Sequence, residues 1–165
     1  MYVVRTTLSA AILIFGAVSA FGQDSLLRLG EGVKAHAGID RIYSDFSKSY
    51  ETLDHKRLAG LYTEDAAYLL PDQEIVIGQA PIEAIFKSFF DQIKASGRSI
   101  SIEFVIVKRT FGDKLGYDIG TFEIKSMLNG KVSPLGTGKF VVVTKLGSDK
   151  KWRFAVDGYS ELPKK

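Results

Sequence analysis

The chain has 165 residues, a net charge of +3 and 45% hydrophobic residues, the profile of one globular domain rather than of a disordered chain. Its 22 basic and 19 acidic residues are interleaved, whereas nucleic-acid-binding proteins gather Lys and Arg on one face. We therefore expect no nucleic-acid partner. The chain has no cysteine, which excludes disulfides, thiolate nucleophiles and cysteine-ligated metal sites.

The N-terminus has the features of a secretory signal peptide. An apolar stretch covers residues 8–18, and Arg5 is the only charged residue before it. Small residues such as Ala20 and Gly22 follow at the spacing that signal peptidase cleaves. The stretch is shorter than a membrane span, which needs about 20 residues. We interpret residues 1–22 as a signal peptide, so we expect an exported protein, periplasmic or secreted, with no stable membrane insertion after cleavage. The alternative is an uncleaved anchor or a buried helix.

Three helices are expected in the first half of the remaining chain. Residues 23–38 contain three glycines and a short apolar run, and we interpret them as a lead-in segment with one helical turn. Apolar residues at spacings of three and four predict an amphipathic helix from Ile39 onward. Asp54 is suited to cap a second, short helix. A third helix follows, with Pro81 in its first turn, and ends near Gly97.

Strands dominate the second half. Alternating apolar and polar residues predict four long strands in series, over residues 99–109, 115–127, 139–146 and 152–159. Asn129-Gly130 predicts a hairpin with a type I′ turn. Two short strands, residues 66–70 and 74–77, precede the third helix. The sequence thus predicts one α+β domain over residues 39–162, a curved antiparallel sheet wrapped by about three helices around an apolar pocket.

Several segments, in this order, resemble a known family. They are Leu53-Asp54, Leu61-Tyr62-Thr63-Glu64-Asp65-Ala66, Gly78, Tyr117-Asp118-Ile119-Gly120 and Lys151-Trp152-Arg153-Phe154. Their order and spacing resemble the SnoaL-like group of the nuclear transport factor two superfamily, to which ketosteroid isomerases also belong. The resemblance covers about residues 39–162. It implies a cone-shaped α+β fold that is open at one end, and a homodimer that forms through the open sheet face.

The same resemblance argues against steroid isomerisation. Ketosteroid isomerases use a Tyr on the first helix and a protonated Asp on a late strand as an oxyanion hole, with an Asp base after the first short strand. When the chains are placed by the Leu-Asp and Glu-Asp-Ala segments, Phe46, Leu70 and Gly138 fall at these positions. Phe46 cannot donate a hydrogen bond and Leu70 cannot take a proton, so we do not expect this chemistry.

Three carboxylates remain as candidate catalytic residues. Asp72 follows Pro71 in a predicted turn, where Asp is common, and it is placed to act as a base at the mouth of the pocket. Asp118 and Asp157 lie on late strands, and two carboxylates that converge in a cavity can act as acid and base. The structural alternative for each is a solvated or hydrogen-bonded carboxylate.

The predicted pocket is mainly aromatic. We expect the ligand-binding residues to be Tyr43, Phe46, Tyr50, Tyr68, Leu70, Phe86, Phe90 and Tyr117. Structural packing is the alternative role for each buried aromatic residue. The two histidines, His36 and His55, have no ligand partner at spacing three or four, so we expect neither a metal nor a cofactor.

Three hypotheses for function follow. The first is an exported, non-catalytic domain that binds a small apolar ligand or associates with itself, because the isomerase positions are apolar. The second is a lyase, isomerase or hydratase that acts on a small hydrophobic substrate through Asp and Tyr residues. The third is a structural dimer with a filled cone. An internal cavity of at least about 300 Å³ with convergent polar groups separates the first two from the third.

Overall fold

The computed structural model describes residues 26–163, and the predicted signal peptide lies outside this range. The elements, in chain order, are β1 (Leu27–Leu29), α1 (Ala37–Thr52), α2 (His55–Ala59), β2 (Tyr62–Leu69), β3 (Val76–Ile77), α3 (Gln79–Ala95), β4 (Ser99–Phe111), β5 (Leu115–Leu128), β6 (Lys131–Leu146) and β7 (Trp152–Glu161). The predicted α+β class and the order of helices and long strands are confirmed.

Local side-chain contacts explain where the first two helices begin and end. The Nδ1 atom of His36 accepts a hydrogen bond from the Ile39 backbone N–H at 3.2 Å and caps α1. α1 ends at Leu53, which has a left-handed φ of 52°. Asp54 caps α2 as predicted, since its Oδ1 accepts from the Arg57 backbone N–H at 3.0 Å.

The strands form one seven-stranded sheet in the order β1-β4-β5-β6-β7-β2-β3. β4, β5, β6 and β7 form the predicted antiparallel meander. The β5–β6 hairpin turns at Asn129 and Gly130, both with positive φ, as a type I′ turn requires. β2 crosses back to lie parallel to β7, so early and late segments of the chain meet in the sheet.

The segment before α1 differs from the prediction. Residues 27–29 form β1 rather than a helical turn, and this strand pairs in parallel with residues 104–106 of β4. The backbone N–H of Gly30 also donates to the Ile106 carbonyl at 2.8 Å. The sheet therefore begins before residue 39, where we expected the domain to start.

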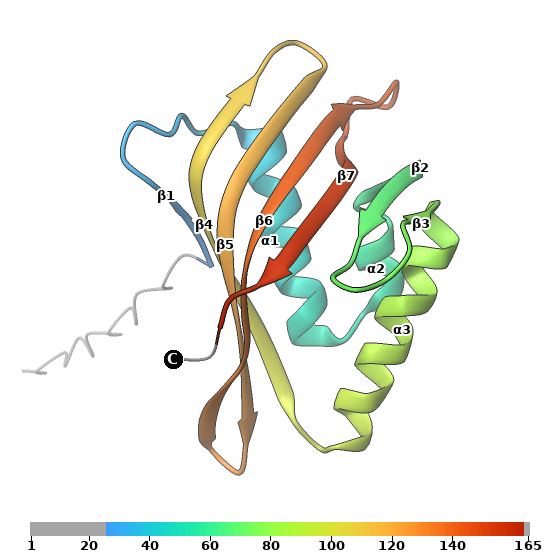
Figure 1. The fold of residues 1–165 in the computed structure, drawn as a ribbon, viewed down its shortest axis with the longest axis vertical. Helices are drawn as coiled ribbons and strands as arrows, with labels where there is room; N and C mark the ends of the chain where they lie inside the picture. The colour runs from blue at the N-terminus through green and yellow to red at the C-terminus, as the bar shows by residue number, and fades with distance from the viewer. Residues whose placement is uncertain (1–25, 164–165) are drawn as a thin grey trace, which may run out of the picture.

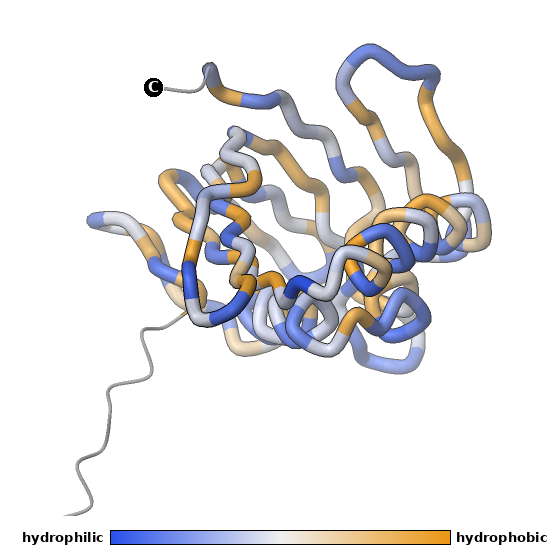
Figure 2. Tube along the Cα trace, turned by 90° about the horizontal axis from the view of Figure 1, so that it is seen from below, coloured by the Kyte–Doolittle hydropathy of each residue, from blue (hydrophilic) through white to orange (hydrophobic). Residues whose placement is uncertain are grey.

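The sheet curves, and the three helices of the described residues lie together on one side of it (Figure 1). Apolar residues recur along the helices and the strands that they cover (Figure 2). The core between them contains fully buried Tyr43, Phe90 and Phe154. α1 contacts β4 and β7, and α3 contacts β2, β3 and β4. No helix within residues 26–163 combines the length and apolar character that crossing a membrane requires.

Candidate functional site

A cavity of about 440 Å³ lies between the sheet and the helices. Its wall combines α1 and α3 with the inner faces of β2, β4, β5, β6 and β7. The lining residues that the site depends on are Tyr43, Phe46, Tyr50, Tyr68, Leu70, Phe86, Phe89, Phe104, Phe122, Phe140, Phe154, Asp157, Tyr159 and Glu161. The cone is therefore not filled by its own side chains.

Aromatic rings that contact one another form most of this wall. Phe46 stacks on Tyr50 with ring centroids 5.4 Å apart, and it meets Phe86 edge-on at 6.0 Å. Tyr68 stacks on Phe86 at 5.7 Å. These residues come from α1, β2 and α3, so the packing of the helices against β2 shapes the cavity. Each of these rings is held in place by its neighbours, so the packing between them fixes the shape of this wall.

Asp157 brings a carboxylate to this apolar wall. It lies on β7, where it is 8% exposed, and its Oδ2 accepts a hydrogen bond from the Tyr62 hydroxyl at 2.6 Å. Its Oδ1 has no hydrogen-bond partner among residues 26–163. Burial raises the pKa of Asp157 to about 6, and the hydrogen bond from Tyr62 acts in the opposite direction. Asp157 can therefore exchange a proton near neutral pH.

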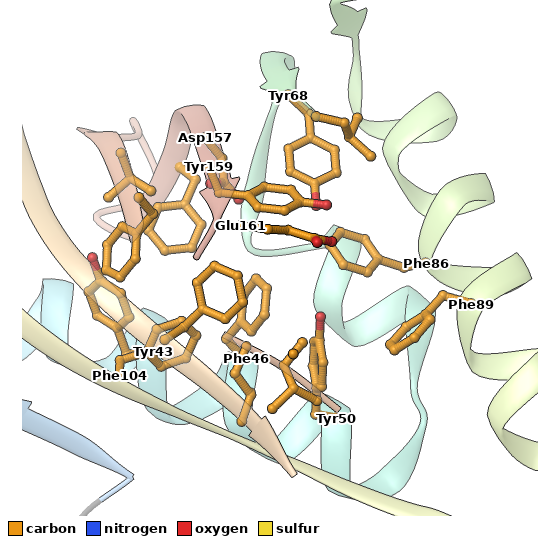
Figure 3. A pocket seen from close by; sticks show the side chains of 18 of the residues that line it. Tyr43, Phe46, Tyr50, Tyr68, Phe86, Phe89, Phe104, Asp157, Tyr159 and Glu161 are labelled. Carbon is orange, nitrogen blue, oxygen red and sulfur yellow. The ribbon is translucent and has the colours of Figure 1, made fainter. Parts of the chain in front are cut away.

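Three phenols accompany Asp157 in the cavity. The Tyr50 hydroxyl points into the cavity from α1 (Figure 3) and has no hydrogen-bond partner among the described residues. The polar ends of Tyr68, Tyr159 and Glu161 lie together across from it (Figure 3). Burial raises the pKa of Tyr50 and of Tyr68 above the usual range, so both phenols stay neutral and can donate a hydrogen bond.

Asp118 is buried but belongs to a different network. The Arg109 guanidinium donates to both of its oxygens at 2.8 Å, and the Tyr43 hydroxyl donates to Oδ2 at 2.8 Å. Arg109 also pairs with Asp40 on α1. Burial lowers the pKa of Arg109, but its hydrogen bonds to Asp118 and Asp40 outweigh this and keep it charged. Asp118 does not line the cavity, and its charge is already neutralised.

Asp118 and Asp157 do not converge. They belong to one row of cross-strand partners, Asp118 on β5 opposite Val142 on β6, and Val142 opposite Asp157 on β7. Two strand spacings separate them, about 10 Å. The hypothesis of an acid–base pair formed by these two residues is therefore not supported.

Three other predicted site residues lie outside the cavity. Asp72 is exposed in the turn before β3 and has a φ of 57°. It is therefore a turn residue, the structural alternative to a catalytic base. Tyr117 lies on the outer face of β5 beside Thr110 and Lys108, because its neighbour Asp118 faces inward and strand residues alternate. Phe90 is fully buried in the core, and the preceding residue on α3, Phe89, lines the cavity instead.

Comparison with known proteins identifies the fold. No protein-family model matches this sequence, and no curated protein matches it. A structure of a nuclear transport factor two-like protein with a cystatin-like fold from Novosphingobium aromaticivorans covers 78% of this chain and 82% of its own, with a TM-score of 0.66 and 14% identity. A ketosteroid isomerase-like protein from Erwinia carotovora atroseptica covers 78% and 96%, with a TM-score of 0.60 and 14% identity. This chain has the nuclear transport factor two-like fold.

A third structure with this fold contains a ligand. It is a protein from Catenulispora acidiphila in complex with S-DNPA, with a TM-score of 0.66 and 12% identity, covering 76% of this chain and 91% of its own. The resemblance to the nuclear transport factor two superfamily that the sequence suggested is thus confirmed at the level of fold.

Within this nuclear transport factor two-like fold, the positions that we assigned to the isomerase triad are apolar. Phe46 and Leu70 line the cavity, and their side chains contain no polar atom. At Gly138, a side chain would meet the Phe122 ring at 2.4 Å, so the strand accepts no Asp there without rearrangement. The acidic and phenolic groups of this cavity lie elsewhere, on β2, β7 and α1.

The sequence prediction missed Tyr159 and Glu161, and it expected Tyr62 as an interior phenol but on the wrong element. The apolar spacing assigns Tyr62 to a helix, whereas it begins β2 and holds Asp157. Tyr159 and Glu161 follow Asp157 at intervals of two on β7 and share its inner face. That alternation is readable in the sequence, but the predicted strand ends at residue 159. Within residues 26–163, no group of His, Cys, Asp or Glu side chains is arranged to hold a metal ion.

Proposed function

We propose that this protein is a small-molecule-binding domain whose cavity holds a largely apolar ligand with one polar end. The observation that carries the proposal is the cavity of about 440 Å³, a size typical of ligand sites. Two polar groups face it without a hydrogen-bond partner in the described part of the chain, the Tyr50 hydroxyl and Asp157 Oδ1. Both are accessible from the cavity, so water or the polar end of a ligand can hydrogen-bond to them there. The S-DNPA complex of a protein with this fold supports the proposal.

Binding is tested with the neutral fluorescent probe N-phenyl-1-naphthylamine and the full-length chain. We expect saturable 1:1 binding, which Gly136→Trp weakens at least tenfold, because Gly136 lines the cavity and a side chain there starts in open space. Gly112→Trp, in the distant β4–β5 turn, is the matched control. Native mass spectrometry of protein from its host reports any retained ligand. No probe binding and a ligand-free mass spectrum would together contradict the proposal.

Export and self-association belong to the same proposal. The apolar stretch at residues 8–18 with small residues after it supports secretion. N-terminal sequencing of the protein from the periplasm or medium tests this, with a first residue near Gln23 expected. A row of exposed apolar residues on the outer sheet face, Ile119, Val141 and Leu69, supports association of two copies through that face.

Catalysis by Asp157 is the second candidate function. The specific observation is that Asp157 has a pKa of about 6, faces the cavity and lies beside phenols that can donate protons. A lyase, isomerase or hydratase of a small hydrophobic substrate needs such a base. Turnover of the ligand recovered from the host, with a rate that rises through pH 6 and is abolished by Asp157→Asn, would establish it. Unchanged ligand after prolonged incubation would favour simple binding.

A further inference from the structure

The charges on the cavity wall all have one sign. Among its lining residues, Asp157 and Glu161 are acidic, and none is Lys, Arg or His. The buried cation Arg109 is held by Asp40 and Asp118 and does not reach the cavity. A carboxylate ligand would thus enter a site with no cation to receive it, and its desolvation would be uncompensated.

Asp157 has no counter-ion within residues 26–163, unlike Asp118, the other carboxylate in the same cross-strand row. Both Asp118 and Asp157 are at most 8% exposed and accept one phenolic hydrogen bond, from Tyr43 and Tyr62 respectively. Asp118 also receives two charged hydrogen bonds from Arg109. Buried charges in proteins are paired. Because Asp157 lines the cavity, a cation placed there can supply the missing charge.

The rings around Asp157 suit a cation as well. The ring centroids of Tyr68 and Tyr159 are 6.0 Å apart, and Tyr68 stacks on Phe86 with ring centroids 5.7 Å apart. Aromatic faces attract ammonium groups, and enclosed aromatic cages are a recurrent way to bind them. The hydroxyl of Tyr50, which points into the cavity (Figure 3), can accept a hydrogen bond from an ammonium group.

We propose that the cavity binds hydrophobic amines, with the ammonium group paired to Asp157 and the apolar skeleton held by the phenylalanine wall. The inference rests on the proposed binding function and adds the class of ligand. It excludes fatty acids and other hydrophobic carboxylates as preferred ligands. An ammonium group also removes the cost of burying the ionised form of Asp157, because it supplies the opposite charge at hydrogen-bonding distance.

The proposal requires an ionised Asp157. The titratable groups around it are five phenols, on α1 (Tyr43, Tyr50), β2 (Tyr62, Tyr68) and its own strand (Tyr159), and the carboxyl group of Glu161 further along that strand. The buried phenols stay neutral through pH 8, so of Asp157 and the tyrosines around it only Asp157 changes charge between pH 5 and 8. Amine binding should therefore weaken as the pH falls below 6.

The test uses three probes with one skeleton: 1-naphthylmethylamine, 1-naphthalenemethanol and 1-naphthoic acid. Affinities for the full-length chain are measured by calorimetry at pH 7.5. We expect the amine to bind at least tenfold more tightly than the acid, with the alcohol between them. Asp157→Asn should reduce this preference to less than threefold. Glu123→Gln removes the same charge from β5 at a position outside the cavity lining, and should leave the preference unchanged.

The outcomes separate the ligand class from the binding function. If the acid binds as tightly as the amine, or if the alcohol binds best, the amine inference is overturned while binding stands. If Asp157→Asn binds the probes with the full amine preference, Asp157 is not the counter-ion and the inference also fails. If no probe binds and N-phenyl-1-naphthylamine does not bind either, the binding function fails together with the inference. Far-ultraviolet circular dichroism verifies that Asp157→Asn is folded, as expected because the amide oxygen introduced by this substitution can still accept the Tyr62 hydrogen bond.

Discussion

At the residue scale, Asp118 and Asp157 show how similar positions acquire different roles. Both point inward from the same cross-strand row, and a tyrosine hydroxyl donates to each. Arg109 neutralises Asp118, which makes that residue part of the framework. Asp157 faces a cavity instead of a cation, which leaves it free for chemistry or binding. The partner, rather than the burial, distinguishes the structural carboxylate from the one to which we assign a function.

The charge on Asp157 should reduce stability at neutral pH. The folded state raises the pKa of Asp157 from 3.8 to about 6, so between these pH values the native state holds a proton that the unfolded state has released. The free energy of unfolding should therefore fall as the pH rises through this window, by about 3 kcal/mol for two pKa units. Asp157→Asn does not titrate there, so its stability relative to the wild type should increase by about this amount from pH 4 to pH 7. Urea denaturation at both pH values measures it, and a constant difference would contradict it.

Removing the guanidinium of Arg109 should be strongly destabilising. Arg109→Gln leaves Asp118 buried without its cation, for which the expected loss is about 3–5 kcal/mol. Arg153→Gln is the control, because Arg153 pairs with Asp149 in an exposed ion pair and should cost at most about 1 kcal/mol. Urea denaturation of both variants at pH 7 gives the comparison. Equal losses would mean that the Arg109 network adds nothing beyond a surface pair.

The sequence also limits what can be predicted about single side chains. The period of two in strands places Asp157 correctly, and the same period excludes Tyr117 from the pocket, since it cannot face inward when its neighbour Asp118 does. Phe89 and Phe90 differ by about 100° around α3, and both rings contact Tyr50. Which of the two reaches the cavity therefore depends on how the whole of α3 packs against the rest of the domain. Which of two neighbouring helix residues faces a cavity depends on tertiary contacts, and no local sequence pattern contains them.

At the element scale, local sequence patterns predict the helices and the long strands. They do not predict which distant segments of the chain pair in the sheet. Apolar spacing and the Asp54 cap place α1 and α2. β1 has only three residues, and it is a strand because its backbone pairs with that of β4. β6 begins well before the predicted strand, since pairing with β5 continues past a register shift to Lys131. Strand ends are thus determined by the partner strand.

The close approach of elements at Gly120 gives a prediction for the sheet. A Cβ atom at Gly120 on β5 would lie 2.4 Å from the Val105 carbonyl oxygen and 2.7 Å from the Phe140 ring. Gly120→Ala should therefore destabilise the protein by about 1–3 kcal/mol through overpacking. Gly136→Ala is the matched control, because a Cβ there meets no atom within 4 Å. Thermal unfolding of both variants, followed by circular dichroism, measures the difference. An unchanged melting temperature for Gly120→Ala would show that β4 and β5 separate easily.

At the scale of the whole molecule, the two faces of the sheet have separate tasks. The inner face and the helices line the cavity, while the outer face carries no helix among the described residues. An open sheet face that exposes apolar residues is a typical place for association. In the proposed function, binding and self-association therefore use opposite sides of β5, β6 and β7, and changes on one side should leave the other side intact.

Val141 tests this division. It lies near the middle of β6, 48% exposed, with Ile119 and Gly158 as its cross-strand partners. Val141→Lys places a charge in the centre of the proposed interface, where desolvation is costly, so the wild type should sediment as a dimer and this variant as a monomer. Val132→Lys is the control, since Val132 is 60% exposed near the β5–β6 turn, away from this row. It should remain dimeric, and N-phenyl-1-naphthylamine should bind all three proteins with similar affinity, because the inner neighbours Phe140 and Val142 are unchanged. A dimer that survives Val141→Lys would place association elsewhere. A wild type that stays monomeric at roughly 100 µM, where any dimer with a dissociation constant near 1 µM would have formed, would exclude it.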